Sequence, residues 1–166
     1  MCGIAGFLNP RNNDKKTEKE IYQILKKMNE VQRHRGPDDE GIFLENGCAL
    51  GHVRLSILDL YRGHQPMCKK KEGNTYAIIL NGEIYNMKTL KEQLIKEGEM
   101  FSTTSDTEVV LTGYIRYGIS YIEELNGNFF YCSVGWETEE IIFDQRSCWC
   151  EAIILYKTGR YINLCI

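Results

Sequence analysis

The second residue, Cys2, carries two groups that can act together as a catalyst. Because its side chain is small, we expect the initiator methionine to be removed and Cys2 to become the first residue of the mature protein. Its thiol, with a reference pKa of about 8.5, then lies beside a free α-amino group with a reference pKa of about 7.7–8.0. At neutral pH this amine can accept the thiol proton, so one residue supplies both nucleophile and base. Taken alone, Cys2 is as readily an ordinary second residue, and the rest of the chain has to decide between the two interpretations.

Two other stretches place polar residues at the ends of expected elements. Residues 75–80 are apolar enough for a buried strand, which delivers Asn81 and Gly82 at its end. The run Ser-Asp-Thr-Glu around Asp106 has the spacing of a capping box, so Asp106 falls in the first turn of a helix, where the helix dipole favours a carboxylate. The alternative for Asp106 is that it only stabilises the helix start. The alternative for Asn81 and Gly82 is a hairpin turn.

The elements that position these residues follow from hydrophobic period and turn signals. Alternating and β-branched runs predict antiparallel strands, which we place at Gly3–Leu8, Ile42–Glu45, Cys48–Ile57, 75–80 with 83–85, Asn128–Trp136, Glu140–Phe143, Ala152–Lys157 and Tyr161–Ile166. Asn46-Gly47 is typical of a two-residue hairpin. The segments Asn9–Lys16 and Asp59–Gly73 are expected to be loops, the second with a solvated lysine run, Lys69–Lys71.

Three helices and a shorter fourth one complete the pattern. The first follows the capping box of Thr17 and Glu20, the second follows Asn86 and stops at Gly98, the third extends to Gly118, and the short one covers Ile119–Leu125. Apolar residues at helical spacing are expected to face inward, namely Ile21, Ile24, Leu25, Met28 and Val31 in the first helix and Leu90, Leu94 and Ile95 in the second.

Composition restricts the class of protein. Apolar residues make up 43% and charged residues 26% of the 166, which is ordinary for a globular chain. The net charge of −3 gives no reason to propose nucleic acid or an anionic membrane as a partner. With no leader ahead of Cys2 and no apolar run near the roughly 18 residues of a spanning helix, we expect a cytoplasmic protein. Seven cysteines without CxxC spacing, Cys148 and Cys150 included, favour reduced thiols over disulfides or a zinc site.

Seven stretches, taken together, resemble one family in their order and spacing. They read MCGIAGF, RHRGPDDEG, GHVRLSILDL, QPM, LNGEIYN, SDTEVVL and LNGNF. They resemble the glutaminase domain of class II glutamine amidotransferases, and RGPD with LNGEIYN favour the asparagine synthetase branch of that class. The resemblance extends from Met1 to about Phe130. It implies an α+β fold, a four-layer αββα sandwich of two antiparallel sheets of the N-terminal nucleophile hydrolase type, in one domain over residues 1–166.

The resemblance also implies an activity, the hydrolysis of L-glutamine to glutamate and ammonia through a cysteine thioester. Cys2 matches the nucleophile, and Asn81 and Gly82 match the oxyanion hole. The residues that match the substrate-binding positions are Arg54 with the backbone of Leu55, Ser56, Ile57 and Leu58 for the α-carboxylate, and Glu83 and Asp106 for the α-ammonium.

These residue types suit the chemistry of a small zwitterion. A planar guanidinium such as that of Arg54 binds a carboxylate through two parallel hydrogen bonds. Carboxylates accept from an ammonium, and the N–H donors of Asn81 and Gly82 can stabilise a tetrahedral oxyanion. The alternatives are a surface role for Arg54 beside Asp59 and a solvent-facing strand position for Glu83. The three histidines, His34, His52 and His64, are expected to be structural, because an N-terminal amine makes a histidine base unnecessary.

The chain departs from the family in two places. Asparagine synthetases continue into a second domain that binds ATP through a Ser-Gly-Gly-x-Asp loop, and nothing in this sequence resembles it. We therefore expect no cofactor here, with ATP and Mg²⁺ needed only by a synthetase partner or by a part of the protein beyond this chain. After the strand at 141–143 the family has a segment like ARDRLGIKPLYY, whereas this chain reads FDQRSCWCEAIILY, with an atypical stretch at Gln145–Glu151.

Three functions fit these observations. The leading one is a glutaminase domain that supplies ammonia for an asparagine synthetase-like reaction. The second is a catalytically silent, amidotransferase-like module that binds glutamine in a regulatory role. The third is an N-terminal nucleophile hydrolase for another amide, which the carboxylate- and ammonium-binding residues disfavour.

Overall fold

The computed structural model describes residues 2–8, 17–45, 48–56, 63–135, 140–146, 154–158 and 161–165. The chain forms two compact units. Unit 1 consists of Met1–Ser56, His64–Pro66 and Trp149–Ile166, and unit 2 consists of Ile57–Gly63 and Met67–Cys148.

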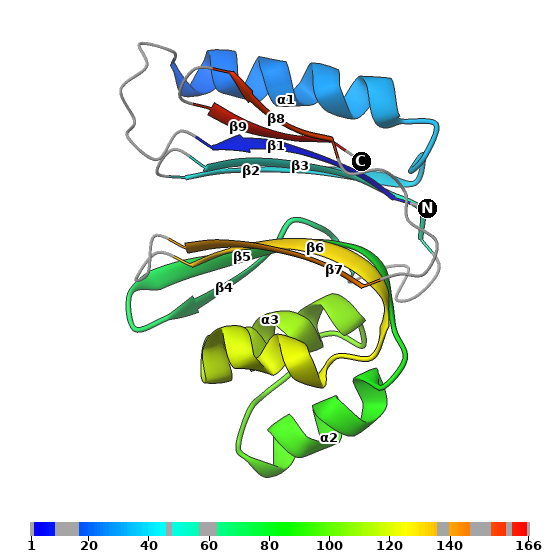
Figure 1. Ribbon diagram of the computed structural model, residues 1–166, viewed down its shortest axis with the longest axis vertical. Helices are drawn as coiled ribbons and strands as arrows, with labels where there is room; N and C mark the ends of the chain where they lie inside the picture. Colours follow the sequence, from blue (N-terminus) through cyan, green and yellow to red (C-terminus); the bar gives the residue numbers. More distant parts are fainter. Residues whose placement is uncertain are drawn as a thin grey trace. The chain divides into compact units, whose positions relative to one another are not determined.

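Unit 1 is built on a five-stranded antiparallel sheet. Its order is β2 (Asp39–Glu45), β3 (Cys48–Arg54), β1 (Gly3–Leu8), β9 (Tyr161–Cys165) and β8 (Ile154–Thr158). The helix α1 (Glu18–Gln32) lies along one face of this sheet (Figure 1). β1 is the central strand: all of it pairs with β3, and its residues 5–8 also pair with β9.

The helix α1 begins as expected but buries a different face. Thr17 and Glu20 form the complete capping box, in which the Thr17 N–H donates to Glu20 Oε2 at 2.7 Å and the Glu20 N–H donates to Thr17 Oγ1 at 3.3 Å. Leu25 is fully buried against β1 and β3, whereas Val31 is 76% exposed. The prediction that Val31 packs inward is therefore wrong. Val31 is six residues from Leu25 and so points about 120° away from it around the helix, whereas Asn29, four residues on, points only about 40° away and is buried.

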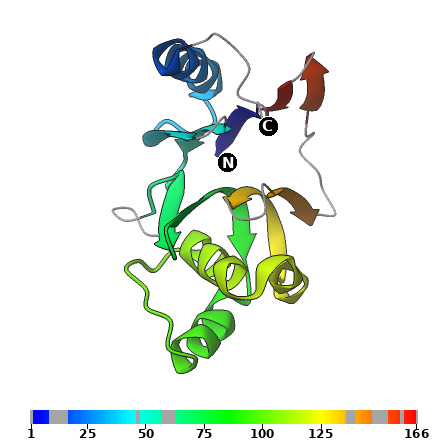
Figure 2. The same ribbon diagram turned by 90° about the vertical axis from the view of Figure 1, so that its left-hand side faces the viewer.

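Unit 2 contains the second sheet and the remaining helices. The strand order is β4 (Met67–Lys71), β5 (Asn74–Ile84), β6 (Gly127–Gly135) and β7 (Glu140–Arg146), all antiparallel. The helix α3 (Asp106–Tyr117) and the 3₁₀ helix η1 (Gly118–Glu124) lie on one face of this sheet, and α2 (Met87–Lys96) packs against α3 on the same side (Figures 1 and 2).

The core of unit 2 lies between this sheet and α3. Val109 and Leu111 of α3 are fully buried and pack with Ile78 of β5 and Leu94 of α2. The prediction that Ile95 also packs inward is wrong, because its side chain is 52% exposed. One residue past Leu94 is a rotation of about 100°, which carries Ile95 off the packed face.

The expected loop before β5 contains a strand instead. Lys69–Lys71 belong to β4, and the alternation of side chains along that strand turns Lys69 toward α3 while Lys70 is exposed. The prediction of a wholly solvated lysine run is therefore wrong for Lys69, which forms an ion pair with the buried Glu108. Because the three residues are all lysines, their sequence does not show the alternation of partly buried and exposed side chains along the strand.

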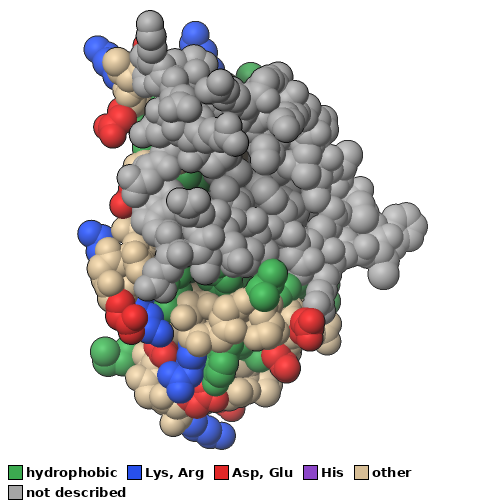
Figure 3. Space-filling view, turned by 60° about the vertical axis from the view of Figure 1, so that its left-hand side comes forward, with side chains coloured by type: hydrophobic (Ala, Val, Ile, Leu, Met, Phe, Trp, Pro, Cys, Tyr) green, Lys and Arg blue, Asp and Glu red, His purple; other side chains and the backbone are tan. Residues whose placement is uncertain are grey.

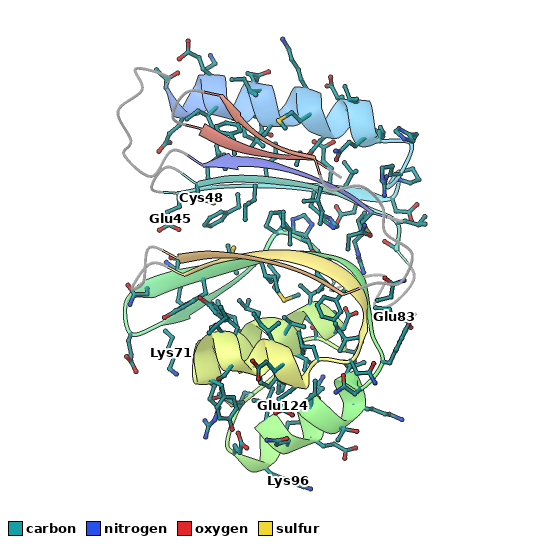
Figure 4. All side chains as sticks on the ribbon, in the orientation of Figure 1. Glu45, Cys48, Lys71, Glu83, Lys96 and Glu124 are labelled. Carbon is teal, nitrogen blue, oxygen red and sulfur yellow. The ribbon has the colours of Figure 1, made fainter. Side chains whose placement is uncertain are left out.

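Most other element boundaries agree with the sequence to within three residues. β2 begins at Asp39 instead of Ile42, and β3 ends at Arg54 instead of Ile57. Figure 4 labels Glu45 and Cys48, the last register pair of β2 and β3. The loop at 9–16, the turn at 46–47 and Cys148 and Cys150 lie outside the described residues. The expected α+β class with two antiparallel sheets is confirmed.

Candidate active site

In unit 1, Cys2 directly precedes β1. Its Sγ donates to the carbonyl of Leu55 at 3.8 Å, and the Arg35 Nε–H donates to the Cys2 carbonyl at 3.2 Å. Burial raises the pKa of the Cys2 thiol above its ordinary value, and the positive charge of Arg54 acts in the opposite direction. The thiol is thus half-buried, protonated at rest and in need of a base to become a nucleophile.

Arg54 lies beside Cys2 because of the strand register. Gly3 pairs with Val53, so the next residues outward are Cys2, directly before β1, and Arg54, the last residue of β3. The Arg54 side chain is only 6% exposed. The interpretation of Arg54 as a surface residue is therefore wrong, and Asp59, its supposed partner, lies outside the described residues.

The turn after α1 holds the backbone at Arg54 and at Ser56. The backbone N–H of Asp38 donates to the Arg54 carbonyl at 3.0 Å, and its carboxylate Oδ2 accepts from the Ser56 N–H at 2.8 Å. Gly36 allows this close approach, since a Cβ on it would lie 2.4 Å from the Val53 carbonyl carbon and 2.5 Å from the Arg54 nitrogen. The residues Arg35–Asp38 therefore act as a brace for Cys2, Arg54 and Ser56.

In unit 2, Asn81, Gly82 and Glu83 lie within β5 and not in a turn. They pair with Phe130, Phe129 and Asn128 of β6, so the hairpin interpretation of Asn81-Gly82 is wrong. Asn81 is buried, whereas Glu83 is exposed near the carboxyl end of the strand (Figure 4). The exposure of Glu83 agrees with a solvent-facing strand position and leaves its carboxylate open to a ligand.

The backbone conformation and the close surroundings of Gly82 leave no place for a side chain. Its φ is +143°, a conformation that side chains rarely permit, and a Cβ would lie 2.2 Å from the Asn128 carbonyl oxygen. Its peptide is therefore held against β6 in a way that only glycine allows.

Asp106 is fixed between α3 and the end of β5. Its Oδ2 accepts from the Ile84 N–H at 3.3 Å and its Oδ1 from the Thr107 N–H at 2.8 Å, and the side chain is 8% exposed. Burial raises the pKa of the Asp106 carboxyl, and the negative charge of Glu83 adds to this increase. A buried carboxylate of this kind is suited to a cationic group, which would stabilise its ionised form.

The structure thus groups the expected site residues into two sets. Unit 1 holds Cys2, Arg54, Leu55 and Ser56, and unit 2 holds Asn81, Gly82, Glu83 and Asp106. Ile57 and Leu58 lie outside the described residues. Arg35 and Asp38 were missed as functional positions, although both lie in the RHRGPDDEG stretch. The Gly-Pro pair inside that stretch was the available signal, because it marks a turn rather than a continuing helix.

Two of the three histidines make polar contacts at the protein surface, and the third is buried. His34 Nδ1 donates to the Val31 carbonyl at 3.1 Å, and His64 Nδ1 lies 2.8 Å from Asp39 Oδ2. His52 is fully buried in β3. That the histidines are structural stays a prediction.

The described part of the chain contains no group of three or more His, Cys, Asp or Glu residues that could hold a metal ion. In the same part, none of the helices has both the length and the apolarity to cross a membrane. On the described part of the face in Figure 3, acidic and basic side chains are interspersed and do not form a basic patch.

Comparison with known families decides the class of protein. Residues 1–146 match the glutamine amidotransferase domain family. The chain belongs to this family. The match ends at Arg146, just inside the stretch where the sequence departs from the expected ARDRLGIKPLYY segment.

Among curated proteins this amidotransferase domain is similar to asparagine synthetases. It is 38% identical over 146 residues to asparagine synthetase (glutamine-hydrolyzing) 3 of Bacillus subtilis, covering 88% of this chain and 23% of that protein. It is 34% identical over 129 residues to asparagine synthetase B (glutamine-hydrolyzing) of Escherichia coli, covering 78% of this chain and 22% of that protein. The chain therefore spans about a quarter of the length of these relatives.

Solved structures confirm the fold. Glutamine phosphoribosylpyrophosphate amidotransferase from B. subtilis has a TM-score of 0.77 with this chain at 20% sequence identity, over 99% of this chain and 41% of that one. The allosteric regulatory enzyme of purine biosynthesis has a TM-score of 0.78 over the same shares. The amidotransferase domain thus has the expected N-terminal nucleophile type of fold.

Proposed function

We propose that this domain hydrolyses the side-chain amide of L-glutamine to glutamate and ammonia, with Cys2 as the nucleophile. The observation that carries the proposal is the strand register that sets Cys2 beside the buried Arg54 in a chain of the amidotransferase family. A thiol next to a buried guanidinium is suited to a small substrate that bears both an amide to be cleaved and a carboxylate, which the guanidinium can bind.

Unit 1 provides the nucleophile and the carboxylate-binding groups. Once Met1 is removed, the α-amine of Cys2 takes the thiol proton and the thiolate attacks the amide carbon. Arg54 binds the α-carboxylate through its planar fork, together with backbone groups of residues 55–58. Arg35 and Asp38 keep these groups in place through the Cys2 carbonyl and the Ser56 N–H.

Unit 2 provides the groups that stabilise the negative charge of the tetrahedral intermediate and bind the positive charge of the substrate. The Asn81 side chain and the Gly82 N–H donate to the oxyanion of the tetrahedral intermediate, and loss of one such donor lowers kcat about a hundred- to thousandfold. Glu83 and Asp106 accept from the α-ammonium. Ammonia leaves with the proton carried by the Cys2 amine, and water then cleaves the γ-glutamyl thioester.

The released ammonia serves an asparagine synthetase-like reaction on this proposal. The support is the similarity to proteins named as glutamine-hydrolyzing asparagine synthetases. The glutaminase step itself needs no cofactor, and ATP and Mg²⁺ belong to a synthetase domain or subunit that consumes the ammonia. We place the reaction in the cytoplasm, where the cysteines stay reduced.

The test combines intact mass with a glutamate-release assay. We expect a mass that lacks Met1, turnover of glutamine, and complete loss of turnover in Cys2→Ala. The matched control is Cys68→Ala, which removes an exposed thiol on β4 and should change kcat/KM by less than about twofold. A processed chain that binds glutamine in calorimetry without releasing glutamate would overturn hydrolysis in favour of a silent binding module. Activity on amides that lack the α-amino acid group would point instead to a different hydrolase.

A further inference from the structure

The buried carboxylate of Glu108 organises the segment that leads into Asp106. Glu108 is 1% exposed and lies two residues after Asp106 in α3. Its oxygens accept from the Ser102 N–H at 3.0 Å, the Thr103 N–H at 2.7 Å and the Thr103 hydroxyl at 2.6 Å. The chain before the helix is therefore wrapped around this carboxylate.

At the start of α3, the Glu108 side chain does not make the hydrogen bond that a capping box would give it. Ser105 caps α3 by accepting from the Glu108 N–H at 3.3 Å, which is one half of a capping box. In the other half, the Glu108 side chain would accept from the Ser105 N–H. Here the Ser105 N–H instead donates to Thr103 Oγ1 at 3.2 Å, and the Glu108 carboxylate reaches further back along the chain.

Lys69 of β4 supplies the matching positive charge. Its Nζ lies 3.0 Å from Glu108 Oε1 and donates to Thr112 Oγ1 at 2.7 Å. The Thr112 hydroxyl in turn donates to the Glu108 carbonyl at 2.7 Å. Lys69 thus ties the second sheet to two successive turns of α3.

The loop is secured from its other side as well. The Lys91 Nζ of α2 donates to the Thr103 carbonyl at 2.7 Å. The ammonium groups of Lys69 and Lys91 lie 5.1 and 4.8 Å from the centroid of the Phe101 ring, within the range of cation–π attraction. The segment 101–105 is therefore fixed by β4, α2 and α3 together.

This arrangement determines where the Asp106 carboxylate lies. Asp106 is the first residue after the fixed segment, and its carboxylate accepts from the Ile84 N–H of β5 and from the Thr107 N–H. Because both of those contacts are to backbone groups, the side chain is placed only as accurately as α3 is placed against β5. A displacement of the helix start by a fraction of an ångström changes the direction in which Asp106 accepts a ligand.

We propose that the Lys69–Glu108 ion pair is the positioning element that aims Asp106 at the α-ammonium of the substrate. The proposal rests on the proposed function, since it takes glutamine as the ligand. Lys69 and Glu108 touch neither the substrate nor the reacting atoms, so they act through Asp106 alone. Their removal therefore selectively weakens binding of a ligand that carries an α-ammonium.

The test compares glutamine with glutaramate, which is glutamine without its α-amino group. Dissociation constants are measured by calorimetry in the Cys2→Ala background, so that no turnover intervenes. We expect Lys69→Met to raise the dissociation constant for glutamine about tenfold and that for glutaramate less than about twofold. Lys70→Met, on the exposed side of the same strand, is the matched control and should change neither constant.

Further variants separate positioning from general damage. Glu108→Gln should show the same selectivity with a larger effect, and Lys69→Arg, which keeps the charge, should restore most of the glutamine affinity. In an Asp106→Asn background the effect of Lys69→Met should fall below about twofold, because the group being aimed is gone. Equal weakening of both ligands, or none, in Lys69→Met would overturn the inference. Failure of the Cys2→Ala parent to bind glutamine would instead overturn the proposed function.

Discussion

Asp38 accepts a hydrogen bond from the backbone N–H of Ser56 at 2.8 Å, across 18 residues of sequence. The same residue donates its own N–H to the Arg54 carbonyl at 3.0 Å. The turn after α1 thereby sets the direction in which the chain leaves β3, directly after the arginine that we propose binds the substrate carboxylate.

Replacing Asp38 by Ala should lower the free energy of unfolding by about 1 kcal/mol, since one hydrogen bond to an exposed carboxylate is lost. It should also raise KM for glutamine more than it lowers kcat, because the segment after Arg54 loses its anchor. Urea denaturation and steady-state kinetics measure the two effects. Asp39→Ala is the matched control, because that neighbouring carboxylate faces the exposed His64. Equal kinetic effects in the two variants would contradict the role of Asp38.

Gly36→Ala should destabilise unit 1 by about 2 kcal/mol or more, because the added methyl group meets backbone atoms that have no room to move. The clashing atoms are the Val53 carbonyl at 2.4 Å and the Arg54 nitrogen at 2.5 Å. Gly73→Ala serves as the control: it adds a methyl with no atom within 4 Å at a φ of +87° and should cost only about 1 kcal/mol of backbone strain. Thermal unfolding of both variants gives the comparison, and a Gly36→Ala protein as stable as Gly73→Ala would refute the close approach.

The ion pair of Glu108 predicts an acid-dependent loss of stability. Although burial opposes ionisation, hydrogen bonds from Thr103 and Ser102 and the ion pair with Lys69 lower the pKa of Glu108 from 4.5 to about 2. Because the folded-state pKa lies below the unfolded one, this stabilisation is complete above pH 4.5 and is lost as the pH falls toward about 2. A shift of this size corresponds to roughly 3 kcal/mol.

Denaturant unfolding of the wild type and of Glu108→Gln across this pH range measures that contribution. The difference in unfolding free energy between the two proteins should be largest near neutral pH and should shrink toward about pH 2. A difference that stays constant with pH would show that the ionised carboxylate is not the source of the stabilisation.

Two neighbouring residues of α2 test which face of that helix is packed. Leu94→Ala should lower the unfolding free energy by about 2–5 kcal/mol, because Leu94 is 1% exposed and its removal leaves a cavity. Ile95→Ala should change it by less than about 1 kcal/mol, because that side chain is 52% exposed. The two substitutions remove a similar number of atoms from adjacent positions, so similar losses of stability would place the packed face elsewhere.

The amino-acid sequence by itself determined the features that depend on short spacings. The capping box of Thr17 and Glu20 and the cap by Ser105 each join residues three apart, so the helix starts were predicted correctly. Alternation and turn signals predicted the strands of the two sheets except β4, together with their antiparallel pairing, and the order of the motifs indicated the family to which the chain belongs.

Only the tertiary structure decided whether a given side chain is buried or exposed and which distant residue it contacts. Val31 and Ile95 continue an apolar stripe in the sequence, yet the width of the packed face leaves them exposed. Lys69 belongs to a run of three lysines, and its pairing with Glu108 depends on β4 packing beside α3, 39 residues further along the chain. The brace between Asp38 and Ser56 likewise depends on the pairing of β2 with β3, which brings the two residues together. Such contacts join positions that are far apart in sequence, and no local spacing specifies them.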